Sequence, residues 1–354
     1  INDLAPSGAQ KLFTWENRKN GAISLPDYNI DAGFGGPVPL LSKKLGNLRF
    51  FASFRSEHDA YLYQVSRPGL NKVSSLIKLT SDLSKSMKLS FTHIAGELEA
   101  TTLSRGGGAS YMNDVWDLAS QVNMRGFTMP WRLFTNIYWS PATVNNATTA
   151  MKLTHQLSPK SFYDVLVKFD KKDYHTWHGA RRDTTRDNEI LDGYYVDDSP
   201  EGFWGSPYFS VDGRIAFGGA ISTARDTSII KSFTIKSDFT SQYNRSNQIK
   251  AGMEFIYNDL DLQFGSRNEF LPEGNYWTSM TQQPYRLSMY AQDKLEHEGF
   301  VAIAGLNLDY VDPNGEWYVL DIYDDQFYSS NYSPEQDDKF QKEKLKGNIS
   351  LSPR

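Results

Sequence analysis

This sequence predicts an all-β fold, a transmembrane antiparallel up-and-down β-barrel with long extracellular loops. Three observations lead to it. Apolar and polar residues alternate along many short segments, the connections between these segments alternate between short and long, and 14% of the 354 residues are aromatic. Alternation alone also describes a soluble antiparallel sheet with one face on a core. The prediction therefore depends on the three observations together.

The strand segments are recognised by their period of two. Phe233, Ile235 and Phe239 fall on one face of a segment whose other face carries Lys236 and Asp238. Successive side chains of a strand point to opposite faces, so each segment has one apolar and one polar face. We expect about eleven such strands, at 27–36, 47–56, 73–83, 86–96, 147–157, 161–173, 229–240, 247–261, 284–294, 299–310 and 346–354.

The two faces predict two environments, because the outside of a membrane barrel contacts lipid and its interior is polar. The face that we assign to lipid carries Phe50, Val165, Phe233, Phe255 and Met289. The face that we assign to the lumen carries Arg49, Lys168, Lys236, Glu254 and Arg286. Lys or Arg at the bilayer midplane costs roughly 2–4 kcal/mol, and no charged residue occupies the central positions of the apolar face.

The connections between the expected strands alternate in length. Short connections span 38–46, 82–86, 157–160, 242–246 and 294–298, and long ones span 57–72, 97–146, 176–228, 262–283 and 311–345. In an up-and-down membrane barrel, the periplasmic turns are short and the extracellular loops grow long. A soluble sandwich has no reason to follow this order. Residues 110–121 are the least clear and allow a short helix inside a loop.

The composition excludes several classes of protein. A formal net charge of −5, from 42 acidic and 37 basic residues, argues against nucleic-acid binding, for which a basic patch is expected. Without cysteine, the chain has neither disulfides nor Cys-ligated zinc. The mean hydropathy is −0.53, and no run of about 18 apolar residues predicts a membrane-spanning helix. No signal peptide is recognised at the first residues, and no cofactor is expected.

One stretch resembles a known family. The sequence Gly35-Gly36-Pro37-Val38-Pro39 is followed, after a short turn, by Asn47-Leu48-Arg49-Phe50-Phe51-Ala52-Ser53. This arrangement is similar to the early barrel hairpin of Bacteroidetes-type TonB-dependent outer-membrane receptors, and the closing residues 351–354 are similar to a mid-barrel strand. Two prolines cannot donate ladder hydrogen bonds, so they suit the end of a strand. Glycines at 33, 35 and 36 would let neighbouring backbone, such as a plug, approach closely.

The resemblance implies a 22-stranded barrel with an N-terminal plug, in the outer membrane of a Gram-negative bacterium. We therefore expect residues 1–354 to form one domain, a partial barrel from which the plug and the C-terminal strands are absent. The resemblance also implies an import receptor, not an enzyme, that binds a nutrient at its extracellular loops and uses TonB energy. Its implied partners are outer-membrane lipid, the TonB complex acting through the absent plug, and a small-molecule, glycan or peptide ligand. A surface lipoprotein partner is left open.

Aromatic side chains mark the candidate ligand site. The tryptophans in expected long loops are Trp116, Trp131, Trp139, Trp177, Trp204, Trp277 and Trp317, and we add Tyr208 to them. Aromatic side chains in an external vestibule would hold a sugar or an aromatic group by stacking. The alternative is that they form the outer aromatic belt or the small cores of the loops themselves.

His175 and His178 complete the set of ligand-binding candidates. Two histidines three residues apart suit a metal, and the following Arg181 and Arg182 suit an anionic ligand. The spacing fixes no third metal ligand, and solvated loop residues are the alternative. No metal site and no catalytic residue is assigned, because neither a Gly-x-Ser-x-Gly nor a His-Glu-x-x-His motif occurs. A secreted soluble carbohydrate-binding protein or glycoside hydrolase, and a passive porin-like channel, remain as alternative functions.

Overall fold

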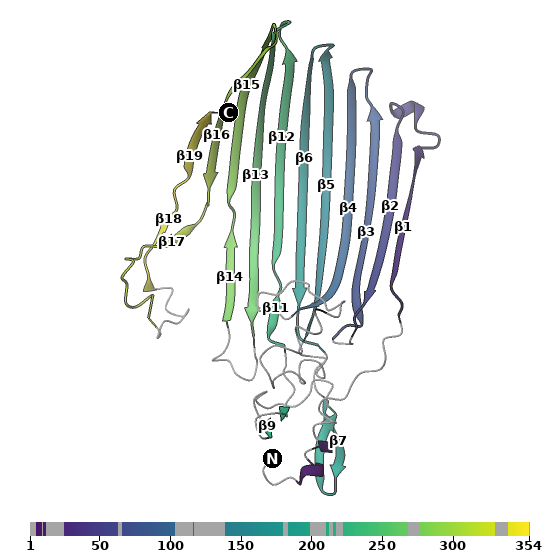
Figure 1. Ribbon diagram of the computed structural model, residues 1–354, viewed down its shortest axis with the longest axis vertical. Coiled ribbons are helices and arrows are strands. Elements are labelled where there is room, and N and C mark those ends of the chain that lie inside the picture. Colours follow the sequence, from purple (N-terminus) through teal and green to yellow (C-terminus); the bar gives the residue numbers. More distant parts are fainter. Residues whose placement is uncertain are drawn as a thin grey trace.

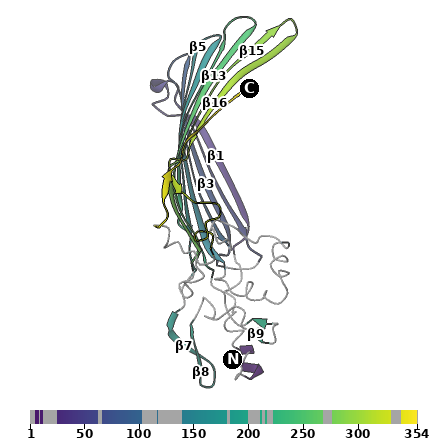
Figure 2. The same ribbon diagram turned by 90° about the vertical axis from the view of Figure 1, so that its left-hand side faces the viewer.

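The protein is described here by a computed structural model, dominated by long antiparallel strands that lie side by side (Figure 1). It describes residues 5–8, 10–11, 25–62, 66–102, 116, 139–179, 183–198, 210–211, 215–216, 222–267, 276–329 and 339–353. These strands make one curved sheet of 13 strands (Figure 2). No helix in these ranges is long and apolar enough to cross a membrane.

The strands of the main sheet follow one another in chain order. They are β1 (Tyr28–Pro37), β2 (Arg49–Ala60), β3 (Gly69–Asp82), β4 (Met87–Thr102), β5 (Ser140–Ser158), β6 (Ser161–Thr176), β11 (Ala224–Asp226), β12 (Ile229–Gln242), β13 (Asn247–Ser266), β14 (Tyr276–Gln282), β15 (Tyr285–His297), β16 (Phe300–Asp312) and β19 (Asn348–Pro353). Each long strand pairs antiparallel with its neighbour in sequence. The up-and-down topology is therefore confirmed.

Smaller elements lie outside the main sheet. A 3-10 helix, η1 (Lys43–Leu45), lies between β1 and β2. Three short hairpins pair β7 (Asp183–Leu191) with β8 (Tyr194–Asp198), β9 (Ser210–Val211) with β10 (Ile215–Ala216), and β17 (Glu316–Tyr318) with β18 (Lys342–Lys344). Each hairpin falls in a connection that the sequence predicted to be a long loop.

All eleven expected strands are present, but several extend further than predicted, and the longest extensions are toward the long connections. β4 continues to Thr102 and β6 to Thr176, beyond the expected ends at 96 and 173. The prediction of a loop throughout 262–283 is wrong. β13 runs to Ser266, whereas its partner β15 begins opposite Tyr257, so β14 pairs with the remaining end of β13. The expected helix at 110–121 lies outside the described residues except for Trp116.

The two ends of the sheet differ as predicted. The short connections gather at the upper end of Figure 1, and the long ones leave from the lower end. We call the upper end periplasmic and the lower end extracellular, because barrel loops are long on the outside.

The pairing register joins the apolar face into continuous rows of side chains that cross the whole sheet. One row consists of Gly36, Phe50, Leu79, Phe91, Met151, Val167, Ile235, Phe255, Leu287, Tyr310 and Ile349. The next row toward the periplasmic end contains Leu89, Leu153, Val165, Ser237, Met253, Met289, Leu308 and Leu351. Neither row contains a charged side chain.

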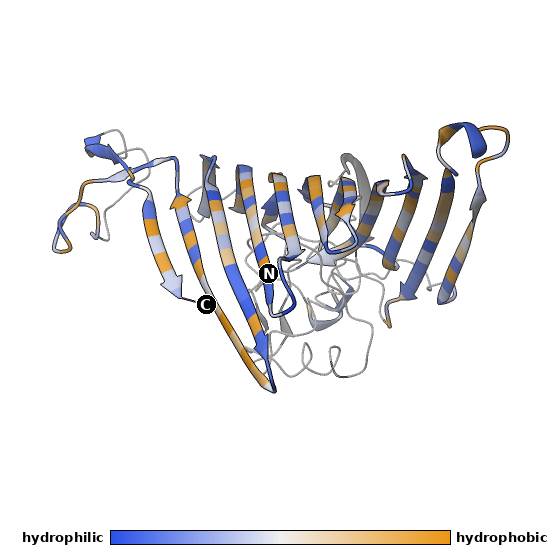
Figure 3. Ribbon diagram, turned by 90° about the horizontal axis from the view of Figure 1, so that it is seen from above, coloured by the Kyte–Doolittle hydropathy of each residue, from blue (hydrophilic) through white to orange (hydrophobic). Residues whose placement is uncertain are grey.

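The opposite face has the reverse character. One of its rows consists of Arg49, Thr80, Ser90, Lys152, Leu166, Lys236, Glu254, Ser288, Asp309 and Ser350. Figure 3 shows the same alternation as hydrophobic and hydrophilic stripes along the strands. The five residues that we assigned to the lipid face share one face, and the five assigned to the lumen share the other.

Large apolar side chains are exposed in the described part of the chain. Large apolar side chains on the apolar face stay open, with Phe34 67%, Met151 49% and Met289 42% exposed. The few buried apolar residues belong to the extracellular end, among them Tyr61, Leu70 and Trp139. A continuous apolar surface of this kind is what lipid-facing strands present.

Two of the predicted close approaches at glycine are made by an aromatic ring. A Cβ on Gly33 would lie 3.5 Å from the Phe51 ring, and a Cβ on Gly35 would lie 2.7 Å from the Phe50 carbonyl oxygen and 3.2 Å from the Phe51 ring. Phe51 therefore covers both glycines, an arrangement known to stabilise glycine in sheets. Gly36 differs, because no atom lies within 4 Å of its Cβ position.

Candidate functional site

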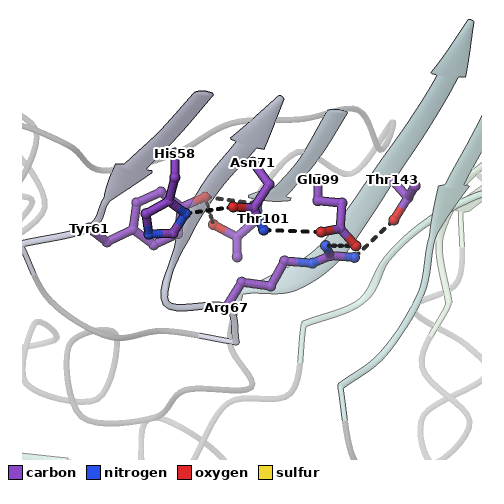
Figure 4. Close-up of polar contacts among 7 residues, drawn as sticks. All are labelled: His58, Tyr61, Arg67, Asn71, Glu99, Thr101 and Thr143. Carbon is purple, nitrogen blue, oxygen red and sulfur yellow. Dashed lines mark hydrogen bonds and ion pairs between the residues drawn. The ribbon is translucent and has the colours of Figure 1, made fainter. Parts of the chain in front are cut away.

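Polar side chains, one of them buried, gather at the extracellular ends of β2 to β5, on the same face as the apolar rows. His58, Asn71, Glu99 and Thr143 are direct cross-strand neighbours there. The Nδ1 of His58 donates a hydrogen bond to the Asn71 Oδ1 at 2.5 Å, and the Asn71 Nδ2 donates to the Glu99 Oε2 at 3.1 Å (Figure 4). His58 is 1% exposed, and Tyr28 stacks on its ring at 5.6 Å. The ends of β2, β3 and β4 are thus joined by one hydrogen-bonded row.

Residues of the connection between β2 and β3 bind to this row of side chains. The Arg67 guanidinium contacts the Glu99 carboxylate at 2.7 Å and donates to the Thr143 hydroxyl at 2.8 Å. The Tyr61 hydroxyl oxygen accepts a hydrogen bond from the Thr101 backbone N–H at 3.2 Å. Figure 4 shows Tyr61 and Arg67 reaching beyond their own hairpin toward β4 and β5. We call this set the β2–β3 latch.

The electrostatics of the latch centre on Glu99. Burial raises the pKa of this carboxyl, but hydrogen bonds from Asn71 and Arg67, with the positive charge of Arg67, lower it by more. The net pKa lies below the usual value. Glu99 therefore stays ionised as the acceptor of the latch in mildly acidic surroundings.

A second group of side chains lies at the extracellular ends of β6, β11, β13 and β14. The Arg225 guanidinium lies 5.4 Å from the centre of the Trp177 ring, and the Arg267 guanidinium lies 4.6 Å from that of Trp277. Arg225 also donates to the carbonyl oxygens of Ser222 and Ala224, each at 2.8 Å, and is only 4% exposed. Arg225 pairs with Gly265, which pairs with Trp277. We call this group the Trp–Arg row.

Asp226 follows Arg225 in the chain and points to the other face, where Thr176 is its cross-strand partner. It is 6% exposed, and its Oδ1 accepts a hydrogen bond from the Ser228 backbone N–H at 2.9 Å. Burial raises the pKa of this carboxyl, although the hydrogen bonds from Ser228 oppose the shift.

Several of the predicted ligand residues meet in or beside the Trp–Arg row. The rings of Trp177 and His178 lie 5.9 Å apart, and the Trp177 backbone N–H donates to the Pro141 carbonyl, next to the buried Ser140. Trp139, just before Ser140, is 3% exposed. Trp277 joins the row from β14. These tryptophans lie within or directly beside strands, contrary to the expectation that they occupy loops.

The faces of the sheet show where these side chains point. His175 lies within β6, as the cross-strand partner of Thr143, so it shares the face of the β2–β3 latch and of Val165. Trp277 is the partner of Gly265 and falls on the same face as Phe255. This is the face that we assigned to lipid. The interpretation as an outer aromatic belt therefore gains support for Trp277 over that of a central vestibule.

Other predicted residues stand apart. Trp116 is 84% exposed. Trp317, in β17, is 56% exposed and contacts Tyr318, which packs against Phe327 and Phe340 in a small aromatic core. Trp131, Trp204, Tyr208, Arg181 and Arg182 lie outside the described residues.

The sequence predictions missed the residues that make the latch. His58, Tyr61, Arg67 and Glu99 fell in expected connections, where the tryptophans, one tyrosine, a histidine pair and an arginine pair were the candidates. The alternation of β4 continues through Glu97, Glu99 and Thr101, so the extended strand was the available signal. Within the described ranges, no group of three His, Cys, Asp or Glu side chains could hold a metal ion.

Comparisons with known proteins agree with the architecture. No family model and no curated protein matches the sequence. The ferric yersiniabactin uptake receptor FyuA from Yersinia pestis aligns with a TM-score of 0.52 at 7% identity, over 92% of this chain and 41% of that one. The outer-membrane ferripyoverdine receptor of Pseudomonas aeruginosa aligns with a TM-score of 0.50 at 13% identity, over 81% of this chain and 36% of that one.

These similar structures are TonB-dependent outer-membrane receptors, transport proteins rather than enzymes. The described sheet has the fold of part of their barrels, so the predicted fold class is confirmed. The chain spans well under half the length of either receptor.

Proposed function

We propose that residues 1–354 form a single domain that is one part of a larger outer-membrane barrel, and that the complete protein imports a nutrient. The observation that carries this proposal is the pair of uncharged rows of side chains. One row begins on β2 and the other on β4, and both reach β19. The other face of the sheet carries a row with charged side chains. A soluble sheet needs one apolar face against a core, whereas here that face is continuous and open. A closed barrel would satisfy the backbone of both sheet edges in lipid.

Fractionation of host cells tests the location, and gel mobility with and without boiling tests the barrel. We expect the full-length protein in the outer-membrane fraction, with a mobility that changes on boiling because a folded barrel resists the detergent. A protein that is soluble and shows no mobility change would overturn the proposal. It would favour instead the secreted carbohydrate-binding protein or glycoside hydrolase.

Ligand capture is proposed for the extracellular end. The exposed Trp116 and Trp317 are available for stacking, whereas Trp139, Trp177 and Trp277 support the strand ends from which the long connections leave. FyuA and the ferripyoverdine receptor are named for ferric siderophores, which makes a small molecule the first ligand class to test, ahead of a glycan or a peptide.

Growth of the host on single nutrients, compared between wild type and a Trp116→Ala, Trp317→Ala double variant, tests this assignment. We expect loss of growth on one nutrient only, with unchanged amounts of protein in the membrane. Matched Trp116→Phe and Trp317→Phe changes should retain growth if stacking is the contact. Equal growth of the alanine variant on every nutrient would place the ligand contacts elsewhere.

The energy source is proposed from the resemblance. A TonB complex would act on a plug inside the barrel, and the charged lumen-facing row would contact that plug. Deleting the host TonB protein should abolish uptake while leaving the barrel in the membrane. Uptake that persists in that strain would favour the passive channel.

A further inference from the structure

Within the described residues, the apolar face carries one carboxylate close to its periplasmic edge. Asp293 on β15 pairs with Ile249 on one side and Ala304 on the other, so it projects from the same face as Met253 and Met289. It is exposed and makes no hydrogen bond or ion pair within the described residues. The nearest lysine in sequence, Lys294, points to the other face and is paired with Glu296.

The position of Asp293 relative to the membrane follows from the strand geometry. Tyr285, eight residues away on the same face, begins β15 at the extracellular side. At about 3.4 Å per residue and a tilt of about 40°, the two side chains differ in height by roughly 21 Å. The apolar band of a barrel is about 25 Å tall. Asp293 therefore lies near the level where the hydrocarbon of the inner leaflet meets its headgroups.

A shallow apolar groove begins two residues from Asp293. Its floor is the cross-strand pair Ala251 and Ala291, and Phe239 and Leu306 flank them in the same row. Met253 and Met289 stand at its inner end, toward mid-bilayer, in one of the uncharged rows. Small side chains between larger ones leave a depression that only hydrocarbon can fill in a membrane.

We propose that Asp293 and this groove bind one phospholipid with a primary-amine headgroup. The ammonium group pairs with the Asp293 carboxylate, and an acyl chain lies over Ala251 and Ala291 toward Met253. At the level of the headgroups a charged side chain on the lipid face costs little, and a headgroup of opposite charge is within its reach. Within the described residues no basic side chain pairs with Asp293, and the lipid headgroup of complementary charge at this height is the amine of phosphatidylethanolamine.

Native mass spectrometry of the full-length protein in detergent tests the site. The probes are phosphatidylethanolamine and phosphatidylglycerol with identical acyl chains. We expect wild type to retain the ethanolamine lipid about fivefold more than the glycerol lipid, as an ion pair near the surface would give. Asp293→Asn should abolish this preference, and Asp325→Asn, in an extracellular connection, should leave it unchanged.

Ala291→Phe separates the groove from the charge. Filling the floor should reduce retention of both lipids while the remaining preference persists. Equal retention of the two lipids by wild type, or an unchanged preference in Asp293→Asn, would overturn the proposal. A second copy of the protein bound in place of lipid, lost in Ala291→Phe, would also overturn it.

The inference rests on the proposed membrane location, and the same samples distinguish the two failures. A protein that changes mobility on boiling but retains no lipid would overturn the proposed lipid site and leave the proposed barrel intact. A protein whose mobility does not change on boiling would overturn both the proposed barrel and the proposed lipid site.

Discussion

Replacing Val165 with lysine tests which face of the sheet contacts lipid. Val165 pairs with Leu153 and Ser237 in a row without charged side chains. It lies midway along the apolar face of β6 between Ser161 and Phe169. Lysine near the bilayer midplane of a barrel costs roughly 2–4 kcal/mol. We expect Val165→Lys to lower the free energy of unfolding by that amount.

The neighbouring Leu166→Lys is the matched control. It makes a similar aliphatic-to-lysine change one residue along the same strand, but on the opposite face. Its cross-strand neighbours are Lys152 and Lys236, and like charges directly opposite destabilise a sheet by about 0.2–1 kcal/mol per pair. Even with this repulsion, the control is expected to lose less stability than Val165→Lys.

The measurement is equilibrium urea unfolding of the full-length protein in phospholipid vesicles, read from the folded fraction on unboiled gels. Equal losses in the two variants, or a larger loss in Leu166→Lys, would refute the assignment of the faces.

Three further predictions concern single side chains. The lowered pKa of Glu99 means that its ionised form stabilises the folded state above the pH where unfolded glutamate titrates, and that this is lost as the pH falls through the folded pKa. The Tm of Glu99→Gln should therefore lie below wild type at about pH 7, with a difference that shrinks as the pH falls below 4.5. The raised pKa of Asp226 reverses the sign, so Asp226→Asn should raise the Tm at about pH 7, with a gain that shrinks as the pH falls toward about 4. Gly35→Ala places a Cβ 2.7 Å from the Phe50 carbonyl and should lower the urea midpoint, whereas Gly36→Ala, in open space, should leave or raise it; equal midpoints would contradict the packing.

The membrane-facing part of the fold was predictable because each strand residue has only two possible environments, lipid or lumen. Along β12 and β13, each residue either faces lipid or does not. The apolar side chains of Phe233, Ile235 and Phe255 are therefore enough to predict which face they lie on. Connection lengths then oriented the barrel. Register could not be derived in this way, yet it is the register that turns separate alternating segments into uncharged rows crossing the whole sheet.

The extracellular end was less predictable because the alternation reverses its phase where lipid ends, so that the face that is apolar in the membrane becomes polar. β4 continues for six residues beyond its expected end, through Glu97, Glu99 and Thr101. All three lie on the apolar face but are polar, since the strand there is surrounded by its own neighbours and by water. The contact of Arg67 with Glu99 links residues 32 apart in sequence, and no local pattern encodes it.

The same parity argument reassigns part of the predicted ligand site. Counting by twos from Val165 along β6 reaches Phe169 and then His175, so the two predictions, lipid face and ligand site, fall on one side of the sheet. His175 can both face lipid and bind the ligand only if the ligand contacts the outside of the barrel rim. A receptor that takes its ligand into the lumen does not need such a contact. The simpler interpretation assigns the two roles to different residues. The strand-borne aromatic side chains brace the rim, where Arg225 and Arg267 stack on Trp177 and Trp277, and ligand recognition belongs to the exposed residues of the long connections that this rim supports.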